Sequence, residues 1–352
     1  MANKLLERPL SAACSRRLGR SKPKRKRRGG TAQRIVPNLS NHVVCTIAEN
    51  TYFHGVAALL NSLVRANFQG TMVIGYRGEH PTWLDGLETD ATASTYAVTP
   101  TIRLQLVEMA GHWHLNNYKP QLIRKCLFDL HPQAELVYYF DTDIVITRSW
   151  DIFVQWAHMG VVVVLDIADT YMSPYHPYRR AWEAFAARRN HECREFTGYV
   201  NGGCVGIGRA HADFAVVWSE FMEDLERDGA DMRKIRNPGS RLEFARMDQD
   251  MLNATIMATD VPIALLGIEA MGLFPWVGAV MLHALWRDKP WQRNYIIDAL
   301  RGFPPDRAHC SYWDFVEGPI RPFSGPKLFR KRLGLKLGRA IGLLHMRSHR
   351  DL

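Results

Sequence analysis

Hydrophobic residues in the middle of the chain follow two alternating patterns, and the alternation predicts an α/β fold. Runs of β-branched and apolar residues predict buried strands at His42–Glu49, Thr71–Arg77, Ile102–Met109, Glu135–Phe140, Gly160–Leu165 and Cys204–Gly208. Apolar residues at helical spacing predict helices at Phe53–Ala66, from Pro120 to Leu130, and at His211–Arg227. Because strands and helices alternate, we expect one domain with a mostly parallel central sheet flanked by helices.

The longest apolar stretch, Val261–Leu282, contains a single charged residue, Glu269. Its length approaches that of a membrane span. Prolines and glycines interrupt it, however, at Pro262, Gly267, Gly272, Pro275 and Gly278. We therefore expect a buried strand and turn there, and no transmembrane helix.

The net charge of +10 arises at the two ends of the chain. Residues 1–34 hold twelve basic residues and one acid, and residues 327–352 hold eight basic residues and one acid. The stretch between them has 25 basic and 33 acidic residues. A nucleic-acid enzyme usually carries its positive charge on the folded face that meets phosphates. The charge distribution therefore disfavours a nucleic-acid enzyme, and we expect no specific nucleic acid as a partner.

The two basic ends differ in pattern. Residues 1–34 lack apolar periodicity and are expected to form a disordered tail. In 327–352, leucines and Ile341 alternate with Lys and Arg, which is typical of a basic amphipathic helix at an anionic membrane surface. A solvated tail or a helix docked on the body is the alternative. The folded domain is expected to span 35–326.

The six cysteines are scattered, without a CxxC pair. This spacing disfavours a zinc ribbon or a disulfide framework and favours a reducing compartment. The basic run Arg16–Arg28 has no apolar segment after it, so no secretory signal is predicted. We expect a cytoplasmic protein, with the inner face of the membrane as a peripheral location.

Polar residues that could bind a ligand come directly after the apolar runs. In an open α/β sheet, ligands bind beyond the carboxyl ends of the strands. Thr46 to Asn50 follow the first strand, and Asp141-Thr142-Asp143 follow the strand Glu135–Phe140. Two carboxylates so close together suit a hard divalent cation shared with substrate phosphates. A single D-x-D is a weak signal, because solvated turns contain the same pattern.

Three further motifs accompany it in order. They are Asn201-Gly202-Gly203 before a strand, Asp248-Gln249-Asp250 at a helix start, and His283 followed six residues later by Lys289-Pro290-Trp291. Taken singly, Asp248 and Asp250 are typical helix-capping acids, and a histidine after an apolar run is typically a buried core residue. Their common order favours a site.

This series of motifs resembles the nucleotide-sugar glycosyltransferases of the GT-A fold, and within them most of all glycosyltransferase family 8. The resemblance spans 42–291. It implies metal ligation by Asp141, Asp143 and His283, diphosphate contact by Lys289, and a donor-sugar pair Asp248 and Gln249. Asn201 matches a residue of the donor and acceptor pocket, and Thr46, Asn50, Thr142 and Gly202 are further candidates for donor contact. Lys119 and Arg124 both suit the family's basic residue before D-x-D, and the sequence does not choose between them.

Three positions depart from the family pattern. Trp286 stands where the family usually has glycine, Gly202 stands where alanine is common, and the aspartate that contacts uracil has no clear match among Ala48, Glu49 and Asn50. The resemblance implies Mn²⁺ or Mg²⁺ as cofactor, a UDP-hexose donor, a glycan or lipid-linked acceptor, and retention of anomeric configuration. The alternatives are a nucleotide-sugar hydrolase or a non-catalytic carbohydrate-binding protein of the same fold, and a nucleic-acid-associated protein acting through the tails.

Overall fold

The computed structural model describes residues 41–90, 94–168, 170–236, 244–273, 278–285 and 288–348, with the side chains of 345–348 left out. The predicted N-terminal tail, 1–34, lies outside the described residues and stays a prediction. All described residues belong to the compact unit Pro37–Leu352.

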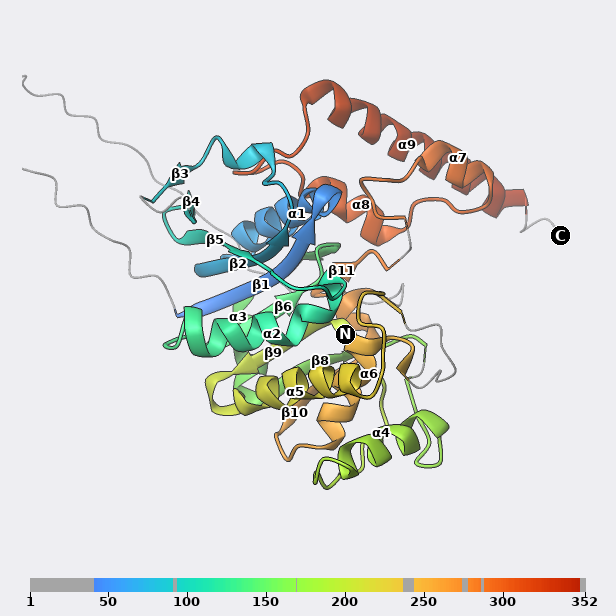
Figure 1. The fold of residues 1–352 in the computed structure, drawn as a ribbon. Coiled ribbons are helices and arrows are strands. Elements are labelled where there is room, and N and C mark those ends of the chain that lie inside the picture. The colour runs from blue at the N-terminus through green and yellow to red at the C-terminus, as the bar shows by residue number, and fades with distance from the viewer. Residues whose placement is uncertain are drawn as a thin grey trace, which may run out of the picture. The chain divides into compact units, whose positions relative to one another are not determined.

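A nine-stranded sheet forms the centre of this unit (Figure 1). Its strands, in chain order, are β1 (His42–Glu49), β2 (Gly70–Arg77), β3 (Glu88–Thr89), β4 (Thr95–Thr99), β5 (Ile102–Glu108), β6 (Leu136–Phe140), β8 (Val161–Leu165), β9 (Val200–Gly208) and β10 (Ile263–Leu266). Their spatial order is β10-β8-β9-β6-β1-β2-β5-β4-β3. Only β9 and β4 run against the other strands of this sheet. The predicted mostly parallel α/β architecture is therefore confirmed.

Helices cover both faces of the sheet and extend beyond it. They are α1 (Phe53–Arg65), α2 (Lys119–Lys125), α3 (Trp150–Met159), α4 (Pro177–Ala187), α5 (Asp213–Arg227), α6 (Met247–Met257), α7 (Tyr295–Leu300), α8 (Arg307–Asp314) and α9 (Gly325–Ser348). One buried cluster unites α2, α4, α5 and α6 with one sheet face, and a second unites α1 and α3 with the other. Burial of these two apolar layers fixes the sheet, and with it the strand ends.

A separate two-stranded sheet pairs β7 (Ile144–Ile146) with β11 (Met281–His283). The apolar stretch Val261–Leu282 forms a strand at each end: β11 is buried as expected, whereas β10 is half-buried with Leu265 exposed. Residues 274–277 within it lie outside the described part. Among the described helices, none is both long and apolar enough to cross a membrane.

Strand β9 is longer than the sequence predicts. It begins at Val200, so the Asn201-Gly202-Gly203 motif lies inside the strand instead of leading into it. The register shifts between β8 and β9 beside this motif, where Val164 pairs with Asn201. Glycine lowers strand propensity, which is why the pattern predicts a start only at Cys204.

Candidate functional site

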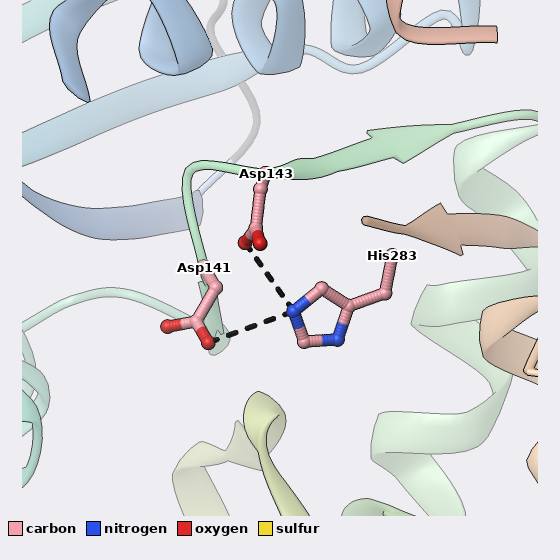
Figure 2. A group of neighbouring side chains, drawn as sticks. All are labelled: Asp141, Asp143 and His283. Carbon is pink, nitrogen blue, oxygen red and sulfur yellow. Dashed lines mark ion pairs between the residues drawn. The ribbon is translucent and has the colours of Figure 1, made fainter. Parts of the chain in front are cut away.

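Asp141, Asp143 and His283 converge at the end of the central sheet. Strand β6 ends at Phe140, and the turn that follows carries both aspartates before the chain enters β7. Strand β11 pairs antiparallel with β7, with His283 opposite Ile144, and the amide of Ala284 donates to the carbonyl of Asp143. Figure 2 shows the imidazole pointing between the two carboxylates. The small sheet therefore brings together residues 140 positions apart in the chain.

The three side chains fit a divalent cation. One ligand atom from each lies within 4.8 Å of the others. His283 Nε2 is 3.3 Å from Asp143 Oδ1 and 3.8 Å from Asp141 Oδ2. The other ring nitrogen, Nδ1, is buried and has no hydrogen-bond partner in the described part of the chain. Two carboxylates and one imidazole form a mixed oxygen and nitrogen donor set, which suits Mn²⁺ or Mg²⁺ more than a thiolate-seeking metal.

Lys289 supplies a positive charge beside these residues. Its Nζ lies 2.6 Å from Asp143 Oδ2. Burial alone would lower the pKa of Lys289, but the charge of Asp143 outweighs burial and holds this pKa above its ordinary value. For Asp143, burial opposes ionisation, yet Lys289 and His283 hold its pKa well below the usual range. Both groups therefore stay charged at neutral pH.

A second lysine joins two of the motifs. Lys119, at the start of α2, is 3% exposed, and its Nζ lies 3.0 Å from Asp141 Oδ1 and 2.8 Å from Asp248 Oδ2. It also donates to the carbonyl of Gly202. Burial opposes its charge, but Asp141 and Asp248 together raise the pKa of Lys119 above its ordinary value. Arg124, the alternative, is exposed on the outer side of α2 near α5 and does not line this site.

For the sugar transfer that the motif resemblance implies, we expect Lys119→Met to lower activity by at least about 100-fold. Loss of the ammonium leaves the buried carboxylate of Asp248 without its cation, which costs about 3–5 kcal/mol of unfolding free energy. The matched control, Arg124→Met, removes an exposed charge and should leave both activity and stability near the unmodified protein. Transfer assays and thermal unfolding of the two variants measure this. Equal effects at the two positions would contradict the placement of Lys119.

A second wall of the site, adjoining the first, is a hydrogen-bonded network around Gln249. Its Oε1 accepts from the amide of Gly202, and its Nε2 donates to Asp166 Oδ2 at 3.2 Å. Asn201 Nδ2 donates to the same oxygen of Asp166 at 2.7 Å, while Asn201 Oδ1 accepts from the amide of Gly203. Both ends of the Gln249 amide are thereby fixed. A group with so little rotational freedom is preorganised for contact with a ligand.

The two acids of the Asp248-Gln249-Asp250 motif have different roles. Asp250 is buried, accepts from the amide of Arg246 at 2.7 Å and from the hydroxyl of Tyr199 at 2.7 Å, and so caps the start of α6. Burial raises the pKa of Asp250 to about 8. Asp248 instead contacts Lys119 and accepts from Asn116 Nδ2 at 3.0 Å. The capping role therefore applies to Asp250, and Asp248 lines the site.

The proposed metal ligands, the two lysines and the residues around Gln249 line one cavity of about 590 Å³. Its volume lies within the range of small-molecule sites. The predicted site residues that line it are Lys119, Asp141, Thr142, Asp143, Asn201, Gly202, Asp248, Gln249, His283 and Lys289. Four motifs from distant parts of the chain thus face a common space.

Besides Arg124, two residues predicted to contact a donor do not line the cavity. Thr46 is fully buried within β1, and its hydroxyl donates to the carbonyl of Phe140 at 2.7 Å. Asn50 is exposed beyond the cavity and adopts a left-handed backbone with φ of 51°. Strand β1 contributes its last residues instead, Ala48 and Glu49. Thr46 lies inside β1, three residues before its carboxyl end, and Asn50 lies one residue beyond that end with its side chain exposed.

The structure adds residues that the motifs do not include. Asp166 follows β8 directly, is buried, and links Asn201 with Gln249. Tyr139 donates its hydroxyl to Asp141 Oδ1 at 2.9 Å. Asp166 could have been found from the sequence, because it lies just after a predicted strand. The same position, at the carboxyl end of a strand, selects Asp141 as a candidate. Trp286, the departure between His283 and Lys289, lies outside the described residues.

Comparison with known proteins bears on the fold. No family model matches the sequence, and neither does any curated protein. Among solved structures, the apo structure of the bifunctional glycosyltransferase WbbM matches 84% of this chain with a TM-score of 0.50 at 12% identity. The chain spans about half of WbbM, 52% of its length. A structure of an active-site mutant of LgtC matches 76% of this chain and 93% of its own, with a TM-score of 0.46 at 11% identity. The match to WbbM shows a shared fold over most of this chain, and together with the mostly parallel sheet it agrees with the predicted GT-A-type architecture.

Proposed function

We propose that this protein is a metal-dependent glycosyltransferase that transfers a hexose from a nucleotide-sugar donor, expected to be a UDP-hexose. The observation that carries the proposal is a single cavity with two adjoining walls, which Lys119 links. On one wall lie the oxygen and nitrogen ligands Asp141, Asp143 and His283 with the cation of Lys289 beside them. On the other lie Asn201, Asp248 and Gln249, held by hydrogen bonds.

The first wall suits the leaving group. Departure of a nucleoside diphosphate develops negative charge on phosphate oxygens. A bound Mn²⁺ or Mg²⁺ would supply Lewis-acid stabilisation of that charge. Lys289 adds a fixed positive charge next to the same carboxylates, within a partly buried site where electrostatic stabilisation is strong.

The second wall suits the sugar. Asp248 and the amide of Gln249 supply hydrogen-bond acceptors and donors for the hydroxyl groups of a sugar. Apolar side chains could not form these hydrogen bonds. We propose retention of anomeric configuration through a front-face route. An amide is a weak nucleophile, and the Oε1 of Gln249 already accepts the N–H of Gly202, which supports a positioning role over covalent attack.

The acceptor we propose is a glycan or a lipid-linked saccharide, and the proposed setting is the cytoplasm at the inner face of a membrane. Supporting features are the basic C-terminal segment and the five described cysteines, all free thiols.

Incubation with UDP-glucose or UDP-galactose tests the proposal and separates it from its alternatives. With Mn²⁺ and a mixture of lipid-linked and free oligosaccharides, we expect labelled sugar to appear on an acceptor, and EDTA to stop the reaction. Donor cleavage at one rate with and without acceptor would instead identify a hydrolase. Donor binding without any turnover would identify a non-catalytic carbohydrate-binding protein.

A further inference from the structure

Helix α9 is docked on the body through one face. Leu328 and Leu335, 7% and 8% exposed, belong to the buried cluster that includes Trp313 and Tyr295. Gly338 continues the same face, and a side chain there would meet the carbonyl oxygen of Tyr295, because a Cβ at that position would lie 2.5 Å away. Small and apolar residues on this face let the helix pack closely against α7.

Polar contacts at the helix edges hold it in place. Lys331 Nζ donates to the carbonyl of Arg293 at 2.8 Å, and Arg332 donates to the carbonyl of Trp313 at 3.1 Å. Arg332 also forms an ion pair with Glu317. The helix is therefore fixed in rotation about its axis, and its outward face is set by the body of the protein.

The outward face carries an apolar stripe. Phe329 and Leu344 are 67% and 66% exposed, and Leu333 and Leu337 lie exposed between them. Positions 329, 333, 337 and 344 fall on one side of an α-helix, opposite Leu328 and Leu335. Of sixteen exposed large hydrophobic side chains among the described residues, eight lie between Ile297 and Leu344. Apolar exposure is thus concentrated on α9 and the adjoining α7 segment, whereas isolated exposed residues would need no explanation.

Cations border this stripe. On the helical wheel, Arg330 lies along one side, and Lys336 and Arg339 lie along the other. All three are exposed, and the helix contains no acidic residue. This combination matches an anionic bilayer surface, where apolar side chains enter the acyl boundary and long cationic side chains reach the phosphates.

We propose that the outward face of α9 docks in the plane of an anionic lipid bilayer. Phe329, Leu333, Leu337 and Leu344 insert at the acyl boundary, and the flanking cations pair with lipid phosphates. The sequence pattern groups Leu328, Leu333, Leu335, Leu337, Ile341 and Leu344 as one amphipathic segment. The structure divides them, because Leu328 and Leu335 pack against the body, Leu333, Leu337 and Leu344 are exposed, and Ile341 is half-buried. This inference concerns attachment and is independent of the donor chemistry.

Vesicle sedimentation of the full-length protein tests this surface. We expect binding to vesicles of equal phosphatidylglycerol and phosphatidylcholine, and much weaker binding to phosphatidylcholine alone. The triple variant Phe329→Ser/Leu333→Ser/Leu337→Ser should lower partition at least about tenfold, since apolar burial contributes about 0.8 kcal/mol for each CH₂. The measurement is made at raised salt, which weakens charge-only binding by the basic N-terminal residues.

The matched control makes the same kind of substitution at other positions on the surface. Phe128→Ser/Met159→Ser/Leu265→Ser replaces three exposed hydrophobic residues away from α9 and should bind vesicles as the unmodified protein does. Donor cleavage by both triple variants in solution should be unchanged, which separates this proposal from that of the catalytic site. Undiminished vesicle binding by the α9 variant would overturn the inference. So would loss of a lipid-independent oligomer in that variant without any change in lipid binding, because the stripe would then be a protein interface.

Discussion

Asp143→Asn is expected to lower sugar transfer by at least about 1,000-fold. Asp143 is the most constrained of the proposed metal ligands, because it is buried and contacts both His283 Nε2 and Lys289 Nζ. Asparagine keeps the size of the side chain but removes the charge that these neighbours and a divalent cation require. The loss should appear in direct Mn²⁺ binding, followed by electron paramagnetic resonance of the free ion, as well as in activity.

Asp288→Asn provides the matched control for this change. Asp288 precedes Lys289, but its side chain is exposed and does not line the cavity. Its removal should leave Mn²⁺ binding and transfer nearly unchanged. Circular dichroism should show that both variants fold. Normal Mn²⁺ affinity in a folded Asp143→Asn protein would show that the ion binds elsewhere.

Gly203→Ala should lower transfer by about 100-fold or more while leaving the fold intact. A Cβ at this position would lie 2.6 Å from His283 Cε1, 2.8 Å from Asn201 Oδ1 and 3.0 Å from Asp141 Oδ2. These are side chains of both walls of the site, so they must move apart to accept a methyl group. Even a displacement of about 1 Å in such a constellation is costly to catalysis.

The adjacent glycine is a control one residue away. At Gly202 a Cβ would lie 3.3 Å from Asp248 Oδ2 and 3.4 Å from the Cβ of Gln249, which requires a shift of only a few tenths of an ångström. Gly202→Ala should therefore keep transfer within about tenfold of the unmodified protein. The ratio of the two rates is the quantity to measure. Equal losses at both positions would contradict the close approach of Gly203 to His283 and Asp141.

The fold follows closely from the sequence pattern where burial is complete. Strand β1 has the predicted bounds, and helix α1 differs by a single residue at its end, because both alternate or repeat apolar residues without interruption. The pattern does not predict the direction of β9, which runs antiparallel to β6 and β8. Strand direction depends on the connections between elements, so it cannot be predicted from local hydrophobicity.

The candidate site, like the fold, is predicted only in part by the sequence. The order of motifs predicts that Asp141, Asp143 and His283 belong together, but it does not reveal that the β7–β11 pairing aligns them. The choice between Lys119 and Arg124 requires the rotation of α2 about its axis, since both residues lie on the same short helix. Motifs do not identify Asp166, because a single aspartate after a strand has no distinctive spacing. Tertiary packing supplies what is missing in each case.

The most direct test of the account is a thermal-shift screen of nucleotide sugars with Mn²⁺. A ligand that binds only the folded protein raises the free energy of unfolding by about 2.7 kcal/mol at one hundred times its dissociation constant. We predict that one donor, expected to be a UDP-hexose, raises the melting temperature by several degrees. EDTA should abolish the shift, and so should the double variant Asp141→Asn/Asp143→Asn. Absence of a response to every nucleotide sugar, or an equal response in the double variant, would contradict the proposed site.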